Sequence, residues 1–198
     1  CDLRAPRGAP SLAPMRPALL DPPDRPGSPA PLPAPARAWP LVVLLRGEDA
    51  TARLAAALAD RLGPGDAVLL SGPIGAGKSA LARALIRARL GDPQAEVPSP
   101  SFTLVQTYGE DEGEVWHADL HRLSGPAEVL ELGLDEAMGR AICLVEWPDR
   151  LGPLTPASAL RIDLSPAPEA AESRRATLSG PEAWAARLQG VADEGADG

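Results

Sequence analysis

Apolar positions along this chain follow two patterns, which predict strands and helices in alternation. Three apolar runs have the length of buried strands: residues 41–45, 67–71 and 141–146. Leu54, Leu58 and Leu62 recur with helical spacing and predict a helix over residues 48–62, and a second helix is predicted over residues 80–90. This order of elements predicts an α/β fold with a mostly parallel central sheet flanked by helices.

Two further regions have the strand patterns of antiparallel pairs. Residues 102–108 and 115–120 flank an acidic turn and predict a β-hairpin. Residues 159–164 and 174–178 alternate apolar and polar positions, and predict an antiparallel pair of strands near the C-terminus. The remaining predicted helices are a stretch over 126–138 and a last helix that begins at a capping box, Ser179-Gly180-Pro181-Glu182, and runs through Trp184 and Leu188.

The first forty residues differ in composition from the rest of the chain. Twelve of the 24 prolines lie there, with almost no apolar periodicity, so residues 1–38 are predicted to be a disordered arm. Residues 39–190 are predicted to form one domain, and residues 191–198 a disordered tail. We expect an extension of the gene model at the start of the chain rather than a lipoprotein beginning at its cysteine, and Met15 is a candidate start of translation.

Charge and cysteine content restrict the classes of function. The formal net charge is −8; residues 41–198 hold 14 of the 19 basic and 24 of the 27 acidic residues, and so carry −10. Nucleic acids are bound mainly through Lys and Arg contacts to phosphate, so any role with nucleic acid is expected to be indirect, through a partner. No apolar stretch approaches the ~20 residues that a membrane helix needs. Cys143 lies in an apolar run typical of a buried thiol, and we expect a cytoplasmic protein.

The only lysine of the chain, Lys78, lies within the pattern G-x-x-x-x-G-K-S of residues 72–79. A strand before this pattern and a helix after it are the context of a phosphate-binding loop, so the fold is predicted to be that of the P-loop NTPases. Glycines let the backbone N–H groups surround phosphate oxygens at the helix N-terminus, and the lysine neutralises the outer phosphates. The predicted nucleotide-binding residues of the loop are Gly72, Ile74, Gly75, Ala76, Gly77, Lys78, Ser79 and Ala80.

A P-loop enzyme also needs a carboxylate at the end of a neighbouring strand to complete a magnesium site. Glu146 ends an apolar run, so we predict that Ser79 and Glu146 hold Mg²⁺ and that ATP is the nucleotide. The alternative is a strand-end carboxylate that faces solvent. Trp147 follows directly and either lies beside the nucleotide or packs on the edge of the core.

His117, Asp119 and His121 alternate and would share one face of a strand. We predict that Asp119 is catalytic and orients the attacking water or supports magnesium; the alternatives are a hydrogen bond to a loop, or a transition-metal site of all three residues. Ser101 lies with Ser99 and Thr103 in a loop held by two prolines. It is predicted to sense the γ-phosphate, although a rigid turn explains the same residues.

Together these segments resemble the TsaE family, also called YjeE, the small bacterial ATPase of tRNA threonylcarbamoyladenosine synthesis. The resemblance runs from about Leu41 to Leu164 and rests on the loop, on Ser99–Val105, on His117–Leu123, on Glu131–Leu134 and on Ile142–Pro148. It implies hydrolysis of ATP in a complex with the TsaB and TsaD proteins, which modifies adenosine 37 of tRNA. It also implies that Glu146 and Ser79 hold magnesium, that Asp119 is needed for activity and that Trp147 lies by the nucleotide.

Three residues depart from the family's pattern. Pro73 stands in place of an acidic residue, Ser101 in place of threonine and His121 in place of tyrosine. Ser101 keeps the hydroxyl, whereas Pro73 removes a charge and one N–H from the loop, so weaker or altered nucleotide binding is expected. Two rival functions remain at this point: a small-molecule kinase that uses the same loop, and a non-catalytic module that senses nucleotide.

Overall fold

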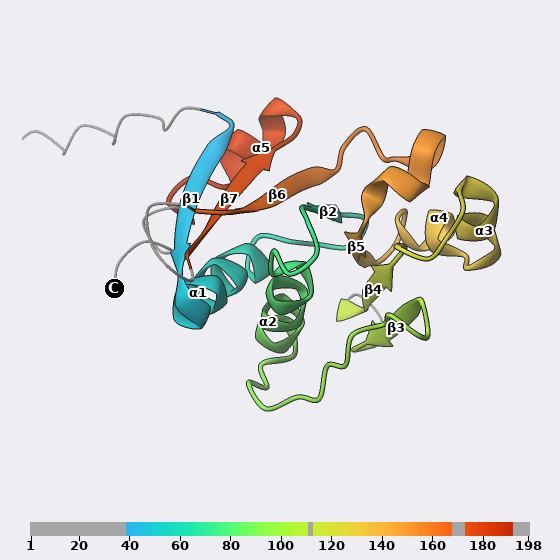
Figure 1. Cartoon of the computed structure of the whole chain (residues 1–198), viewed down its shortest axis with the longest axis horizontal. Coiled ribbons are helices and arrows are strands. Elements are labelled where there is room, and N and C mark those ends of the chain that lie inside the picture. Colours follow the sequence, from blue (N-terminus) through green and yellow to red (C-terminus); the bar gives the residue numbers. More distant parts are fainter. Residues whose placement is uncertain (1–38, 111–112, 168–172, 192–198) are drawn as a thin grey trace, which may run out of the picture. The chain divides into compact units, whose positions relative to one another are not determined.

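Seven strands of the described chain form one mixed sheet, which is the centre of the computed structural model (Figure 1). The structure describes residues 39–110, 113–167 and 173–191, all of which belong to one unit, Ala36–Gly198. The strands are β1 (Leu41–Arg46), β2 (Ala67–Ser71), β3 (Val105–Tyr108), β4 (Val115–Asp119), β5 (Ile142–Glu146), β6 (Leu160–Pro166) and β7 (Ser173–Ser179). Their order across the sheet is β1-β7-β6-β2-β5-β4-β3.

The middle of the sheet is parallel and both margins are antiparallel. β2 lies between β5 and β6 and runs parallel to each, and β4 is parallel to β5. The predicted hairpin of β3 with β4 and the predicted antiparallel pair of β6 with β7 are both confirmed. β1 pairs antiparallel with β7, a neighbour that the sequence analysis did not assign. The predicted α/β class with a parallel centre is therefore confirmed.

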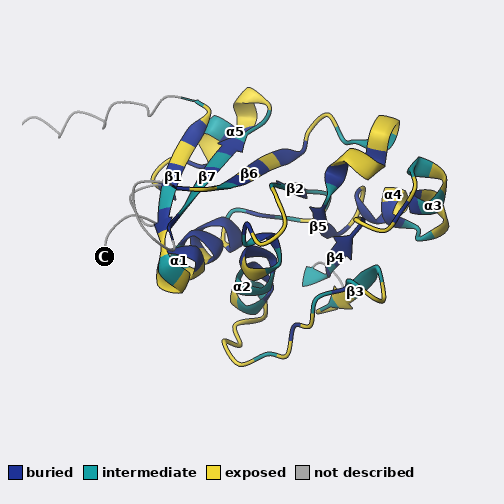
Figure 2. Ribbon diagram, in the orientation of Figure 1, coloured by how far each residue is buried: buried dark blue, intermediate teal, exposed yellow. Residues whose placement is uncertain are grey.

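Helices cover both faces of the sheet. They are α1 (Gly47–Ala59), α2 (Lys78–Leu90), α3 (Pro126–Glu131), α4 (Leu134–Ala137), a 3-10 segment η2 (Pro148–Leu154) and α5 (Glu182–Arg187). Side chains of α1, α2 and α5 join one hydrophobic core with alternate residues of the strands, including Val68 and Leu70 of β2. Side chains of α3, α4 and η2 join a second core with the intervening residues, including Leu69. Two covered faces explain why β2 and β5 are apolar at nearly every position and buried along their length (Figure 2).

Three sequence predictions of element boundaries are wrong, each for a local reason. The helix predicted over 126–138 is two helices, because Gly133 adopts a left-handed φ of 66° between them. The strand predicted over 102–108 begins only at Val105, since Leu104 has a φ of 65° and its N–H bonds to Pro100 in a turn. The capping box is absent: Pro181 is the N-cap of α5, and no side chain caps that helix.

Several remaining predictions concern burial and the chain ends. Burial raises the pKa of the Cys143 thiol to about 12, and this cysteine is free, as expected for a thiol in the core. None of the helices in the described ranges is long and apolar enough to span a membrane. The arm predicted at 1–38 lies outside the described residues, as do residues 192–198 of the predicted tail, whereas Val191 is buried against the domain.

The strand register places the chemistry-bearing residues at one edge of the sheet. Glu146, the last residue of β5, is paired with Leu70 of β2 on one side and with Asp119 of β4 on the other. The glycine loop leaves β2 one residue after Leu70, at Ser71. The carboxyl ends of these three parallel strands therefore meet beside the loop, which is where ligands bind in open α/β sheets.

Candidate functional site

The loop of residues 72–77 joins β2 to α2 and has the backbone form of a phosphate-binding loop. A turn closes it, in which the Ala76 N–H donates to the Pro73 carbonyl at 3.1 Å and Gly75 takes a φ of 79°. Gly77, with a φ of 102°, leads directly into α2. The first turn of α2 holds no acidic residue of its own, and the positive end of this helix faces the loop.

Pro73 fits this turn without strain. It occupies the first of the four turn positions, where no N–H is required, and the left-handed position falls on Gly75. Its carbonyl accepts from both Ala76 and Lys78. The expected effect of Pro73 on nucleotide affinity stays a prediction, because it concerns an N–H that phosphate would otherwise bind.

Lys78 is buried at the base of the loop, with 5% of its surface exposed. Its Nζ donates to the carbonyls of Gly72 at 2.9 Å and Pro73 at 3.0 Å. The same ammonium lies 4.2 Å from the centroid of the Trp147 ring, a cation–π contact. Trp147 has a left-handed φ of 58° directly after β5, and its side chain is partly buried against the core. Two of the three ammonium donors are thus held by the loop itself, and Trp147 covers the lysine from the side.

Ser79 and Glu146 are brought together as the sequence predicted. The Ser79 hydroxyl donates to Glu146 Oε2 at 2.9 Å, and Glu146 is 2% exposed. A solvent-facing glutamate is therefore excluded. A hydroxyl and a carboxylate are hard oxygen ligands of the kind that Mg²⁺ prefers, and they lie beside a helix N-terminus suited to phosphate. The donor set fits magnesium held between this chain and a nucleotide.

Asp119 is the centre of a second hydrogen-bonded set. Its Oδ2 accepts from the Ser101 hydroxyl at 2.9 Å, and Ser101 is hydrogen bonded to Ser99 at 2.8 Å. Its Oδ1 accepts from the His121 N–H at 3.2 Å and from the His121 ring Nδ1 at 2.9 Å. Burial raises the pKa of Asp119, but the bonds from His121 and Ser101 outweigh burial and hold this pKa below its ordinary value. Asp119 is therefore an anion at neutral pH, and it ties the Ser99–Ser101 turn to β4.

The two histidines serve different carboxylates and form no joint metal site. His117 Nε2 lies 2.9 Å from Glu146 Oε1, whereas His121 contacts Asp119. No group of three His, Cys, Asp or Glu side chains in the described ranges is arranged to hold a metal ion. The transition-metal alternative for His117, Asp119 and His121 is therefore not supported.

Not every residue predicted for the site points into it. The Ile74 side chain is 90% exposed at the tip of the loop, and Ala80 is exposed on the first turn of α2. Any contact of these two residues with phosphate is therefore expected from their backbones. Phe102, next to Ser101, is likewise 90% exposed, with the Arg122 guanidinium 5.4 Å from its ring.

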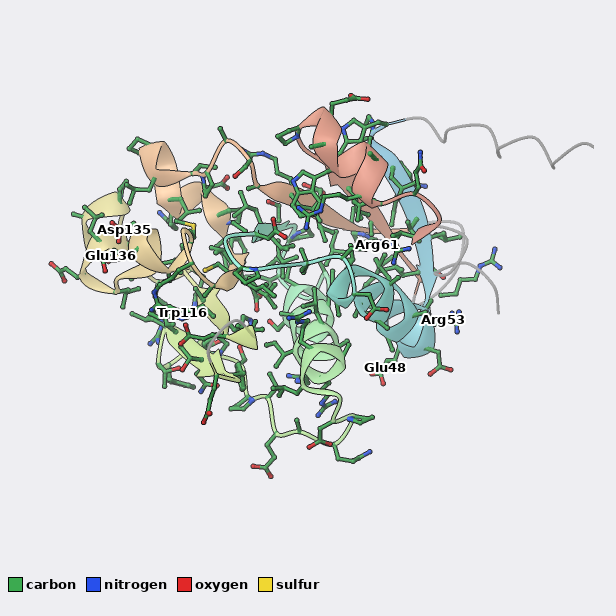
Figure 3. All side chains as sticks on the ribbon, turned by 180° about the vertical axis from the view of Figure 1, so that it is seen from behind. Glu48, Arg53, Arg61, Trp116, Asp135 and Glu136 are labelled. Atoms are coloured by element: carbon green, nitrogen blue, oxygen red, sulfur yellow. The ribbon has the colours of Figure 1, made fainter. Side chains whose placement is uncertain are left out.

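A cavity of about 300 Å³ beside the loop was missed by the sequence analysis. The cavity lies between α1 and α2, and Gly77 lines it. Glu48, at the start of α1, also lines the cavity and is labelled in Figure 3. Arg174 of β7 lines it too and packs so closely on Gly77 that a Cβ there would lie 3.0 Å from the Arg174 side chain. No motif identified Arg174, because its position beside the loop depends on the pairing of β7 with β6.

Comparison with known proteins identifies the family of this chain. The family described as "Threonylcarbamoyl adenosine biosynthesis protein TsaE" matches residues 45–176. Two similar proteins are each named tRNA threonylcarbamoyladenosine biosynthesis protein TsaE. The protein of Rickettsia felis is 41% identical over a match that covers 54% of this chain and 61% of its own length. The protein of Bacillus subtilis is 36% identical over a match that covers 57% of this chain and 68% of its own length. This chain thus matches less than two thirds of the Rickettsia felis relative.

A solved structure supports the same architecture. The crystal structure of Bacillus subtilis YdiB superposes with a TM-score of 0.62 and 24% identity, over 77% of this chain and 94% of its own. At that identity the likeness concerns the fold alone. The family match, in contrast, covers the phosphate loop, Asp119 and Glu146 together, and by it this chain belongs to the TsaE family.

Proposed function

We propose that this protein is a magnesium-dependent ATPase that serves as an accessory component of the machinery forming N6-threonylcarbamoyladenosine at adenosine 37 of tRNA. The observation that carries the proposal is the 2.9 Å hydrogen bond from Ser79 to Glu146, because it joins the phosphate loop to a buried strand-end carboxylate. The biological role is supported by the description of the matching family and by the names of the relatives.

The nucleotide is proposed to lie across the N-terminus of α2. The N–H groups of residues 75–79 would bind the phosphates, and Lys78 would contact the outer phosphate oxygens with its remaining donor. The ribose and base would occupy the cavity beside Gly77 and Arg174, since this cavity adjoins the loop and has the size of a small ligand pocket. Ser79 and Glu146 would hold Mg²⁺, which supplies charge neutralisation to the β- and γ-phosphates.

Hydrolysis would proceed by in-line attack of water on the γ-phosphorus. The water oxygen forms a bond to phosphorus, the bond to the β–γ bridging oxygen breaks, and ADP and inorganic phosphate leave with release of a proton. Asp119 is an ionised acceptor on the strand next to Glu146, so it is suited to orient this water. Lys78 stabilises the charge that develops on the phosphoryl oxygens. Ser101, bonded to Asp119, would let the Ser99–Ser101 turn respond to the γ-phosphate.

The partners are proposed from the family resemblance and from charge. An acidic chain is poorly suited to bind tRNA by itself, so contact with tRNA would run through the TsaB and TsaD proteins. We propose a cytoplasmic location, because the proposed machinery acts on tRNA.

The test is ATP hydrolysis by the wild type, by Lys78→Ala and by Glu146→Gln, each with and without the TsaB–TsaD pair. We expect the pair to stimulate the wild type, and each substitution to lower the stimulated rate by about 100-fold or more. Lys78→Ala removes a positive charge that stabilises the transition state, and Glu146→Gln weakens the site that would hold Mg²⁺. Release of phosphate with no phosphorylated acceptor would separate hydrolysis from kinase activity.

Two results would contradict the proposal in different ways. Equal activity in all three proteins would show that the site is wrongly assigned. A wild type that neither binds nor responds to the TsaB–TsaD pair would refute the accessory role, even if its own hydrolysis depends on Lys78.

A further inference from the structure

His117 and Glu146 form a buried polar pair between neighbouring strands. His117 lies on β4 and Glu146 ends β5, and the two strands run parallel, with His117 paired to Leu144 and Asp119 paired to Glu146. The side chains are 1% and 2% exposed, and His117 Nε2 lies 2.9 Å from Glu146 Oε1. Burying two polar groups costs stability unless they are hydrogen bonded. The contact between His117 and Glu146 offsets this cost for both side chains.

The contact with Glu146 determines which nitrogen of His117 donates a hydrogen bond. An ionised carboxylate only accepts hydrogen bonds, so the imidazole donates through Nε2–H. His117 Nδ1 is buried and has no hydrogen-bond partner among the described residues, as expected for a bare lone pair rather than an N–H. The geometry therefore makes His117 a donor through Nε2, with one fixed orientation of the ring.

Glu146 is consequently held at both oxygens. Ser79 donates to Oε2 and His117 donates to Oε1, each at 2.9 Å. These donors approach from different elements, α2 and β4, so neither alone prevents rotation of the carboxylate. Residues that form hydrogen bonds to a metal ligand orient that ligand, and their loss typically lowers metal affinity by about 10- to 100-fold.

We propose that His117 is a positioning residue that fixes the rotation of Glu146 through Oε1 and thereby sets the affinity of the nucleotide-bound protein for its divalent cation. This inference rests on the proposed function, since it takes Glu146 to be a magnesium ligand. His117 and Asp119 lie two residues apart on the same face of β4, so one strand carries both the partner of Glu146 and the catalytic carboxylate.

The test compares nucleotide binding with and without metal in the full 198-residue chain. A fluorescent ATP analogue is titrated in EDTA and over a range of Mg²⁺ concentrations, and Mn²⁺ binding in the presence of a non-hydrolysable ATP analogue is followed by electron paramagnetic resonance. For His117→Leu we expect the half-saturating metal concentration to rise by about 10- to 100-fold, with unchanged affinity in EDTA.

Three further variants make the result specific. His117→Gln places an amide N–H where Nε2 was and should restore most of the metal affinity, whereas His117→Asn is too short to reach Oε1 and should behave as His117→Leu. His117→Asn also supplies the comparison if His117→Leu does not fold. Val115→Ala, on the same strand and fully buried, should lower the melting temperature without changing the metal dependence.

The outcomes separate this inference from the proposed function. A metal-dependent wild type with the same metal dependence in His117→Asn would refute the role of His117 and leave the proposed function intact. An equal loss of affinity in EDTA and in Mg²⁺ would show a purely structural effect and would also refute it. A wild type that binds no Mn²⁺ and whose nucleotide affinity is the same in EDTA and in Mg²⁺ would overturn both.

Discussion

At the scale of single residues, Asp119 shows how hydrogen bonds outweigh burial. Ser101 bonds to one of its oxygens, and the backbone and ring of His121 bond to the other. All three donors favour the charged form, so the pKa is lowered although the carboxyl is largely removed from water. This carboxylate is therefore charged across the physiological range of pH, as its proposed role requires.

His121→Phe tests this balance. Loss of the ring donor should raise the pKa of Asp119, which a carbon-detected NMR titration of the carboxyl measures. Because the folded-state pKa is lowered, the bonds stabilise the fold above the unfolded value of about 3.9, and this stabilisation is lost as pH falls through the lowered pKa. The variant should thus be less stable than wild type by about 1 kcal/mol at pH 7, and the difference should close in more acid solution.

A matched control for that titration is His121→Asn, whose amide can donate from nearly the position of Nδ1. It should raise the pKa of Asp119 less than His121→Phe does. An unchanged pKa in His121→Phe would mean that the ring contact contributes nothing to the charge state of Asp119.

The predictability of the site differs among its residues. Lys78, Ser79 and Glu146 were identified because their chemistry follows from motif spacing and from an apolar run that ends in a carboxylate. The partners of His117 and His121 were not, because each depends on the register of strands or on a turn. The alternation of His117, Asp119 and His121 is compatible with a metal site, but the structure shows that His117 contacts Glu146 and His121 contacts Asp119.

At the scale of elements, the junction between β2 and the phosphate loop depends on backbone forms that only glycine adopts easily. Gly72 has a φ of 133°, and a Cβ on it would collide with the carbonyl oxygen of Leu164 in β6. Gly75 has a φ of 79°, but no atom lies within 4 Å of the position of its Cβ. The first glycine is thus required by both conformation and close approach, and the second by conformation alone.

Replacing each of these two glycines with alanine should lower the free energy of unfolding by different amounts. Gly72→Ala should lower the free energy of unfolding by about 3 kcal/mol or more, since strain adds to a backbone collision that moves β6. Gly75→Ala should cost about 1 kcal/mol, the penalty of a left-handed residue with free space around it. Urea unfolding followed by circular dichroism measures both. Equal losses would contradict the role assigned to the contact with Leu164.

Element types were better predicted than element ends. Buried strands β2 and β5 were evident because both of their faces are covered, which leaves an uninterrupted apolar run. The end of a helix depends on one backbone angle, as at Gly133, where a modest helical pattern did not indicate the break. The predicted capping box failed similarly, because Pro181 initiates α5 without help from a side chain.

At the scale of the whole molecule, the sheet joins the two ends of the described domain. β1 and β7 pair over six residues, and their alternate side chains enter the core that also holds α1 and α2. The parallel centre could be expected from strands that alternate with helices. The place of β1 in the sheet could not be predicted, because its partner lies far along the chain. The apolar pattern of each strand does not indicate which other strand it pairs with.

The charge of the whole chain predicts weak binding of tRNA. With a formal charge of −8, the isolated protein should bind tRNA with a dissociation constant weaker than about 100 µM at physiological salt. Filter binding measures this, and a sample with the TsaB–TsaD pair added is the positive control. Saturable micromolar binding by the isolated chain, weakened steeply by salt, would contradict an indirect role.

The position of β2 in the sheet also bears on how the protein is made. Both strands that flank β2 follow it in the chain, so the phosphate loop is synthesised well before β5 and β6, which support it. A nascent chain that has left the ribosome only as far as α2 lacks Glu146 and the Leu164 carbonyl beside Gly72. We therefore expect nucleotide to assist folding only after synthesis has passed β6, and until then β2 lacks both of its neighbours in the sheet.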